Sequence, residues 1–183
     1  RVAPTQVAIL PVTPKEDSRA QVLEACETLS KEINECTAFD LPVRVEMDDR
    51  DLRGGEKYWQ WVKKGVPLTV EIGPRDLENG TVFVGRRDLG GKREGMKRQE
   101  FISSLKDTLI TIQKNLFTKA QDFQKYNTRE IDKLDELYKY FTVKNSSKPE
   151  IHGGFALIHW DRNPKWEEQL KNDLKVTIKI PVF

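Results

Sequence analysis

Short apolar segments that alternate with helical patterns constrain the fold of this chain more than any other feature. Residues 7–12 form a continuously apolar run that ends in proline-containing turn chemistry, as expected of a strand covered on both faces. Residues 43–47 and 68–72 alternate apolar with polar side chains, which is typical of strands with one wetter face. An Asn-Gly turn signal precedes residues 81–86, so this fourth strand should pair with the third in a hairpin-like unit. The pattern predicts an α/β fold with a mixed sheet and flanking helices.

Several segments have the spacing or the capping residues of helices. A capping box at 18–21 opens a helix that ends near Cys36. Residues 56–64 predict a short aromatic helix that a glycine stops, and the apolar residues of 101–123 keep helical spacing over about six turns. A further capping pattern at 127–130 predicts another helix directly after it.

The residues beyond these helices predict a small C-terminal domain. Residues 143–150 have the composition of a polar linker. Residues 155–160 and 176–180 then have strand patterns, and between them Pro164 follows a capping asparagine at the start of a helix. We therefore expect three parts, which are an α/β domain at 1–100, a helical connection at 101–142 and a compact βαβ domain at 143–183.

Composition and charge narrow the classes of function. The chain has 31 Lys and Arg against 29 Asp and Glu, and its net charge of +2 excludes a histone-like or polybasic nucleic-acid binder. Its apolar content is too high for a disordered tail, and no apolar run approaches the ~20 residues that span a bilayer. The chain begins at Arg1 rather than Met and lacks a signal-peptide pattern, so we expect a piece of a longer protein.

The cysteines and histidines do not predict a metal site. Cys26 and Cys36 share one apolar helix face with Ile33, where thiols pack as small hydrophobic groups. The two histidines, His152 and His159, have no metal-ligand partner at helical spacing.

Residues 86–98 contain the strongest local excess of positive charge in the chain. On its own, such a charge run is typical of a solvated loop. Its place after a predicted strand favours a second interpretation, in which a rigid sheet edge presents a basic loop to a phosphate backbone. The six positive side chains are Arg86, Arg87, Lys92, Arg93, Lys97 and Arg98.

The aromatic helix interleaves rings with lysines, beginning with Lys57 and Tyr58. This mixture is found where single-stranded RNA is held, because rings stack on bases while ammonium groups hold phosphates. The alternative is that one side of the helix packs on the sheet, and we favour it for Trp61 and Val62. Tyr58 then remains as the stacking candidate.

Arg75 and Asp76, at the end of the third strand, form a third candidate. A guanidinium and a carboxylate can address a guanine from both edges, and a surface turn explains the pair equally well. No nucleophile elbow, phosphate loop, dinucleotide fingerprint or His/Cys constellation occurs in the sequence. The residues alone therefore predict a binding domain.

Three segments of the sequence carry a resemblance to a known family. They are RVAPTQVAILPV at 1–12, RGGEKYWQWVKK at 53–64 and GVPLTVEIGPRDLENGTVFVGRRD at 65–88. Together they resemble the anticodon-binding domain of prolyl-tRNA synthetases of the archaeal/eukaryotic-like group, with its class II anticodon-binding fold. The segments HGGFALIHWD and VTIKIPVF resemble the extra C-terminal domain of that family, so the resemblance runs essentially the whole length.

The resemblance implies that the intact enzyme joins L-proline to tRNA(Pro) with ATP. That chemistry, with its ATP and magnesium, belongs to a class II catalytic domain before Arg1, through which the enzyme forms a homodimer. This part of the chain then has no cofactor and no catalytic residue. Its implied partner is the anticodon loop of tRNA(Pro) rather than DNA or a membrane, and its implied location is the cytoplasm.

The resemblance also assigns roles to single residues. Tyr58 is similar to the family's stacking aromatic, and Arg75 and Asp76 are similar to its guanine-contacting pair. Lys57 and Arg87 are similar to supporting contacts. To these we add Lys92, Arg93 and Lys97 as candidates for contact with the phosphate backbone.

Two departures from the family pattern affect these expectations. Val62 stands where the family typically has Glu, and Thr69 stands where it typically has Arg. We therefore expect guanine selectivity that is either weaker than in relatives or dependent on Arg75 and Asp76. These departures also support an alternative function, a protein-interaction or regulatory module that no longer reads RNA.

A further departure from the family pattern concerns zinc. The first two zinc cysteines of the relatives align with Asp161 and Trp166, and the later pair would lie beyond Phe183. An Asp and a Trp cannot supply half of a thiolate site, so we expect no zinc. The C-terminal domain should then be held by packing of Phe155, Leu157, Trp166, Leu170, Val176 and Ile178.

Overall fold

The computed structural model describes residues 3–13, 16–142, 147, 154–160 and 163–179. The chain divides into two compact units, Arg1–Thr118 and Lys119–Phe183. The division falls inside the long helix α4 (Arg98–Tyr126). A division into compact units does not test the boundaries of functional domains. The boundaries expected after residues 100 and 142 therefore stay a prediction.

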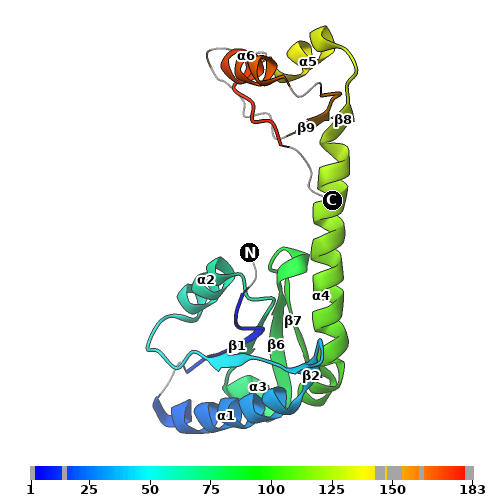
Figure 1. The fold of residues 1–183 in the computed structure, drawn as a ribbon. Helices are drawn as coiled ribbons and strands as arrows, with labels where there is room; N and C mark the ends of the chain where they lie inside the picture. The colour runs from blue at the N-terminus through cyan, green and yellow to red at the C-terminus, as the bar shows by residue number, and fades with distance from the viewer. Residues whose placement is uncertain (1–2, 14–15, 143–146, 148–153, 161–162, 180–183) are drawn as a thin grey trace. The chain divides into compact units, whose positions relative to one another are not determined.

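A five-stranded mixed sheet forms the centre of the first unit, with the order β4-β1-β5-β6-β7 (Figure 1). The strand β1 pairs in parallel with both β4 and β5, and the pairs β5–β6 and β6–β7 are antiparallel. This arrangement confirms the predicted mixed α/β sheet with flanking helices. The strands are β1 (Val7–Pro11), β4 (Val45–Met47), β5 (Leu68–Ile72), β6 (Thr81–Arg86) and β7 (Arg93–Lys97).

The connection between β5 and β6 is a short helix, α3 (Pro74–Asn79), rather than a tight turn alone. The antiparallel pairing expected from the Asn-Gly signal is confirmed, with Val70 opposite Val84. Gly80 ends α3 in the left-handed region at φ 60°, where glycine pays no steric cost. The turn signal therefore marked the end of a helix.

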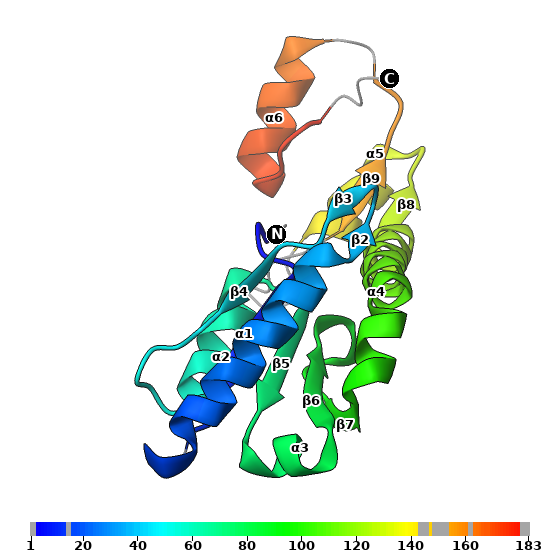
Figure 2. The same ribbon diagram turned by 90° about the horizontal axis from the view of Figure 1, so that it is seen from below.

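One face of the sheet is covered by α1 (Arg19–Glu35) and the first half of α4. Val22, Cys26, Leu29 and Ile33 of α1 are buried there, so the predicted apolar helix face and the core position of Cys26 are confirmed. In the view from below, α1 crosses in front of the sheet and α2 lies behind it (Figure 2). The contributions of α4 to this core are Phe101, Leu105, Leu109 and Ile112.

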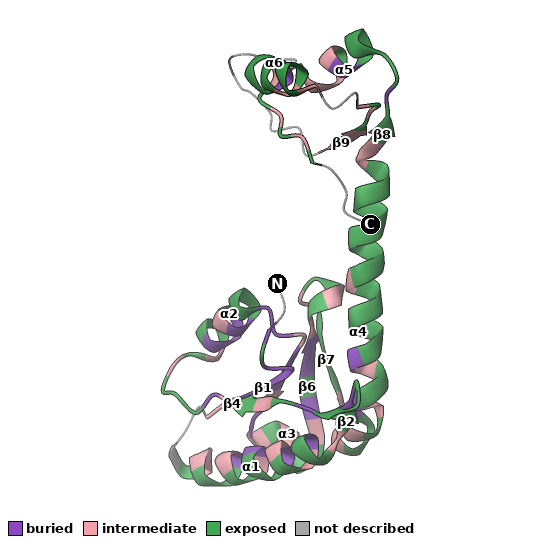
Figure 3. Cartoon of the chain, in the orientation of Figure 1, coloured by how far each residue is buried: buried purple, intermediate pink, exposed green. Residues whose placement is uncertain are grey.

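The opposite face is covered in part by α2 (Gly54–Lys64), which packs on β1. Tyr58 and Trp61 of α2 share a cluster with Ala8 and Leu10, which alternate with the residues of β1 that face α1. Because both faces of β1 are covered, all five of its residues are buried, as the continuous apolar run predicts (Figure 3).

Short elements complete the first unit, beginning with a turn of 3-10 helix at Glu16–Ser18 before α1. The strands β2 (Thr37–Ala38) and β3 (Leu41–Pro42) form a small hairpin after α1. A single turn of 3-10 helix, Arg87–Leu89, follows β6. In the described part of the chain, no helix is long and apolar enough to cross a membrane.

The second unit differs from the predicted βαβ domain. Its sheet joins β8 (Thr128–Glu130) in parallel to β9 (Phe155–Leu157), and its helices are α5 (Leu134–Phe141) and α6 (Pro164–Leu174). The expected strand at 176–180 is wrong over its described part, 176–179. The expected helix start near 127 is also wrong, because those residues pair with β9. Asn163 does cap α6, accepting the amide of Lys165 at 3.1 Å.

Packing in the second unit centres on the residues between its two helices. Ile131, Leu137 and Leu170 are buried, and Val176 and Ile178 are partly buried against them. Phe155 and Leu157, which were expected in this core, are more than half exposed. Packing therefore involves only part of the expected set.

Candidate nucleic-acid interface

Asp48 lies in the acidic loop at 48–51 that follows β4, and its contacts attach α2 to this loop. Its carboxylate accepts two hydrogen bonds from Arg50, both at 2.7 Å, and one from the indole of Trp61 at 2.8 Å. The hydrogen bonds from Arg50, with that from Trp61, lower the pKa of Asp48 to about 2 although burial opposes the shift. The backbone carbonyl of Asp48 accepts a hydrogen bond from the ammonium of Lys57 at 3.0 Å. These contacts fix the position of the aromatic helix.

Lys57, a predicted supporting contact, lies inside the protein. Only 4% of its surface is exposed, and its ammonium binds the loop carbonyl described above. A buried ammonium needs such a partner. The structure therefore gives Lys57 a role in holding the loop, and its contact with RNA stays a prediction.

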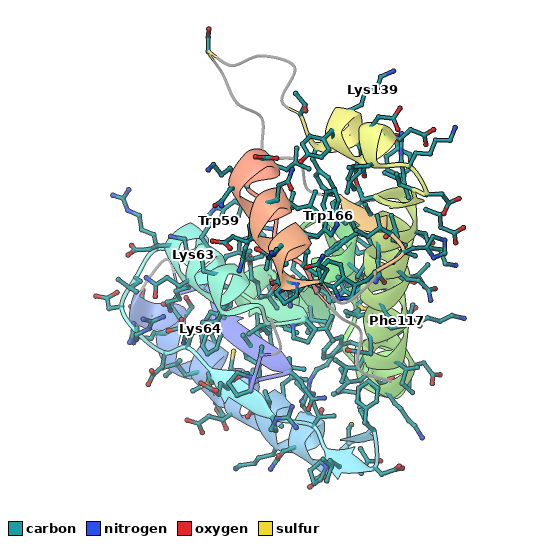
Figure 4. The ribbon with its side chains drawn as sticks, turned by 45° about the horizontal axis from the view of Figure 1, so that its top comes forward. Trp59, Lys63, Lys64, Phe117, Lys139 and Trp166 are labelled. Carbon is teal, nitrogen blue, oxygen red and sulfur yellow. The ribbon has the colours of Figure 1, made fainter. Side chains whose placement is uncertain are left out.

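Tyr58, the predicted stacking residue, is largely covered. It is 7% exposed, its hydroxyl donates to the carbonyl of Gly91 at 3.3 Å, and the guanidinium of Arg93 lies 4.8 Å from its ring centroid. Its neighbour Trp59 is 62% exposed (Figure 4). A helix turns by about 100° per residue, so adjacent rings in α2 point to different surroundings.

The same rotation per residue determines which other side chains of α2 are buried. Trp61 is buried against the sheet as expected, and the ammonium of Lys64 lies 3.8 Å from its ring centroid. Val62, which we also expected to pack on the sheet, is 38% exposed, so that expectation is wrong. Thr69, the other departure from the family pattern, is buried in β5.

Arg75 and Asp76 lie in the first turn of α3. The carboxylate of Asp76 accepts a hydrogen bond from the amide of Gly73 at 2.9 Å, which caps the helix. It accepts a second one from the hydroxyl of Thr81 at 3.2 Å. Each carboxylate oxygen can accept a second bond, which leaves capacity for a ligand. The side chain of Arg75 is exposed, and within the described residues no side-chain hydrogen bond or ion pair engages its guanidinium. The structure thus brings a free cation beside a partly used carboxylate.

Arg87 and its neighbours connect the turn after β6 to the rest of the unit. The guanidinium of Arg87 donates to the carbonyl of Gly65 at 2.8 Å, so this predicted supporting contact holds the end of α2. Arg86 and Asp88 form an ion pair at 2.8 Å, and Asn115 of α4 donates to Asp88 at 2.7 Å. Burial raises the pKa of Asp88, and hydrogen bonds from Arg86 and Asn115 more than offset this, so it is lowered.

The expected basic loop at 86–98 is wrong as a single loop, because Arg86 ends β6, a turn of 3-10 helix follows it and Arg98 begins α4. Gly90 and Gly91 turn the chain at positive φ, and residues 93–97 form β7, which pairs along β6. Pairing with β6 stabilises β7 as a strand, although its polar sequence does not predict one by itself.

The three phosphate candidates have different surroundings. Lys92 is exposed, and no hydrogen bond or ion pair holds its ammonium within the described ranges. Lys97 donates to the carbonyl of Asn79 at 2.9 Å, at the end of α3. Arg93 forms an ion pair with Glu71 of β5. Lys92 is therefore the one whose charge is least compensated, and the three phosphate contacts stay predictions.

The second unit has an open cavity of about 420 Å³. Trp160, Trp166 and Leu170 line it, together with His159, which lies 3.2 Å from Asp132. None of the predicted anticodon residues belongs to its lining.

Within the described residues, no three His, Cys, Asp or Glu side chains lie together in a way that could hold a metal ion. Trp166, at one position where relatives of the resembled family have a zinc cysteine, lies on α6, and Asp161 lies outside the described residues.

Comparison with known proteins now identifies the family. The model of the anticodon binding domain matches residues 6–108, which is more than half of the chain and contains β1 to β7. The chain belongs to the anticodon-binding domain family. The resemblance stated from the sequence is thereby confirmed for the fold and for the domain.

Similarity to individual proteins extends over the whole chain. The proline–tRNA ligase of Protochlamydia amoebophila is 44% identical over 185 residues, which cover 100% of this chain and 36% of that protein. The proline–tRNA ligase 2 of Anaeromyxobacter dehalogenans is 43% identical over 188 residues and is covered to 37%. The proline–tRNA ligase of Bdellovibrio bacteriovorus is 40% identical over 178 residues. The chain spans about a third of the length of these relatives.

Proposed function

We propose that this anticodon-binding domain is part of a proline–tRNA ligase and that it reads the anticodon of tRNA(Pro). The observation that carries the proposal is the 44% identity to such a ligase over the full chain, including the region beyond the matched domain. The full-length enzyme would join L-proline to tRNA(Pro) with ATP and magnesium, as a cytoplasmic homodimer. Its catalytic part would lie outside these 183 residues.

The site geometry supports reading of guanine by α3. The exposed guanidinium of Arg75 supplies donors for O6 and N7, and the capping carboxylate of Asp76 retains acceptor capacity for the opposite edge. Phosphate contacts would come first from Lys92, because its charge has no partner in the described residues. A few such contacts suffice for a protein that reads two bases, which is compatible with a net charge of +2.

A titration with anticodon stem-loops tests the proposal. The chain should bind a stem-loop with both anticodon guanines more tightly than one in which both are replaced by adenine. We expect the replacement to cost about 1 to 3 kcal/mol for each lost bidentate contact. Equal affinity for both stem-loops, or none for either at low salt, would contradict anticodon reading and favour a protein-interaction module.

We also propose that the second unit is held together without zinc. Its buried residues Ile131, Leu137 and Leu170 come from three parts of the chain and pack between α5 and α6. Measurement of the metal content of purified protein, with thermal unfolding in the presence and absence of a chelator, tests this. One equivalent of zinc, or a lower melting temperature with the chelator, would contradict it.

A further inference from the structure

Phe83 is an exposed aromatic residue in the middle of the sheet that the sequence did not single out. It lies in β6 between Val82 and Val84, both of which are buried in the core under α1 and α4. Side chains alternate along a strand, so Phe83 projects from the opposite face, on which α2 packs over β1 and Tyr58 of α2 lies beside Gly85. Its exposed fraction of 37% leaves part of the ring open to a ligand.

The residue opposite Phe83 leaves this ring uncovered. Gly95 of β7 is its register partner, and a Cβ at Gly95 would meet only the Cδ2 of Phe83 at 3.9 Å, an ordinary contact. Gly95 is also outside the glycines with positive φ. Neither packing nor backbone conformation therefore requires glycine here, and close approach of a ligand is one of the roles that a strand glycine has.

Gly85, two residues along β6, shows the contrasting case. A Cβ there would lie 2.6 Å from Oγ1 of Thr69 and 3.5 Å from the ring of Tyr58. Close packing accounts for that glycine completely. The difference between the two glycines is what draws attention to the space beside Phe83.

Arg93 is held next to this ring by two neighbours. Its guanidinium lies 5.6 Å from the ring centroid of Phe83 and 4.8 Å from that of Tyr58, and it forms an ion pair with Glu71. The ion pair compensates its charge, and the guanidinium lies near both rings. An arginine held in this way can stack on a base or donate to its edge, and it is poorly suited to gather phosphates.

We propose that Phe83 is the stacking surface for one base of the anticodon loop, with Arg93 positioned at the edge of that base. The inference rests on the proposed function and deepens it. Base–aromatic stacking needs an accessible ring, and Phe83 is 37% exposed whereas Tyr58 is 7% exposed. Glu71 and Tyr58 act as positioning residues for Arg93.

Two substitutions in the full 183-residue chain test the stacking surface. Phe83→Leu should weaken binding of the guanine-containing stem-loop by roughly 10-fold. Gly95→Thr should keep or raise the melting temperature, because the strand accepts a Cβ, while weakening binding by a similar factor. Phe117→Leu is the matched control, since this exposed phenylalanine lies on α4 (Figure 4) and should bind as the parent does.

A fluorescent base reports on stacking directly. Stem-loops with 2-aminopurine at each anticodon-loop position in turn should show quenching at one position in complex with the parent, and less quenching with Phe83→Leu. Arg93→Gln should change base preference without changing the slope of affinity against salt, whereas Lys92→Gln should reduce that slope.

The outcomes separate this inference from the proposed function. If the parent chain binds the guanine stem-loop selectively and both Phe83→Leu and Gly95→Thr bind equally well, the stacking surface is wrong and anticodon reading stands. If the parent shows no selective binding, both are wrong. Loss of binding in Phe83→Leu with an unchanged melting temperature and lost quenching would support the inference.

Discussion

Asp48 holds the helix α2 in position through several contacts. Its carboxylate is 1% exposed and connects Arg50 to the indole of Trp61, while its carbonyl holds Lys57. Lys57, to which the resemblance assigns a supporting contact with RNA, is therefore engaged with the protein. The exposed residues beside it, such as Trp59 and Lys63, are the ones left for solvent (Figure 4).

Asp48 should make the stability of the protein depend on acid. Its folded pKa of about 2 lies below the ordinary value of 3.8, so the ionised form stabilises the fold. This stabilisation is full above about pH 5 and is lost as the pH falls from 4 toward 2, in total about 2 kcal/mol. Chemical unfolding of the parent and of Asp48→Asn at pH 7 and pH 3 should show a smaller pH effect in the variant. An equal pH effect in both would contradict the assignment.

Arg75 and Lys92 should have different effects on RNA binding. Arg75→Ala should relax the preference for guanine, because its free guanidinium is the candidate base contact. Lys92→Ala should weaken binding to all stem-loops alike and reduce the salt dependence by about one phosphate contact. Titrations at several salt concentrations with guanine and adenine stem-loops measure both effects. An unchanged base preference in Arg75→Ala would remove that residue from the site.

The two cysteines should differ in reactivity. Burial raises the pKa of the Cys26 thiol to about 12, and burial together with Glu32 and Glu35 raises the pKa of Cys36, which is only partly buried. Thiolates are the reactive form, so alkylation at pH 8 should be slow at Cys36 and absent at Cys26 until the protein unfolds. Mass spectrometry of peptides after timed alkylation measures both rates. Fast labelling of Cys26 would show that the α1 core opens readily.

At the scale of elements, the turn from β6 to β7 connects to both α2 and α4. The ion pair of Arg86 with Asp88 connects this turn to α4 through Asn115, and Arg87 connects it to the end of α2. Gly91 brings its backbone against the hydroxyl of Tyr58, so the turn also supports the aromatic helix. Its geometry depends on contacts from three other elements.

The two glycines of this turn allow a matched comparison. Both have positive φ, at 68° for Gly90 and 83° for Gly91, so alanine at either should cost about 1 kcal/mol of stability for the left-handed backbone. A Cβ at Gly91 would also lie 2.8 Å from the hydroxyl of Tyr58, whereas Gly90 faces open space. Gly91→Ala should therefore be destabilising by about 1 to 2 kcal/mol more than Gly90→Ala in urea unfolding. Equal losses would mean that Tyr58 moves aside freely.

At the scale of the whole molecule, the two units have cores of very different size. The first unit contains the sheet core, to which α1 and α4 each contribute four buried residues, and all of its buried members precede Thr118. Among the described residues of the second unit, Ile131, Leu137 and Leu170 are the buried ones. Stability grows with the fraction of surface buried, so the first unit should be the more stable.

Removal of residues 119–183 should leave the first unit folded. Because its core lies within the first 118 residues, the shortened chain should unfold in one cooperative transition within a few degrees of the main transition of the full chain. Calorimetry of both chains measures this, and stem-loop binding checks the interface. Loss of cooperativity in the shortened chain would show that the first unit depends on the second.

Local patterns in the sequence determined the elements whose side chains repeat with a clear period. The α1 face and the apolar run of β1 are examples, because spacing along the chain alone decides which of their side chains can share one face. The residues of β7 and β8 carry no such period. β7 forms a strand because it pairs with β6 across a short turn, and β8 because it pairs with β9 further along the chain. Such pairing cannot be read from either segment alone.

The sequence by itself predicted the family and the mixed sheet, and both are confirmed. Only the tertiary structure decided which side chains remain available. Tyr58 and Lys57 are covered by contacts from β1, Gly91 and Asp48, which lie elsewhere in the chain. Phe83 became a candidate because a glycine on the neighbouring strand leaves its ring open. Exposure depends on what packs against a residue, and that is fixed by the fold rather than by residue type.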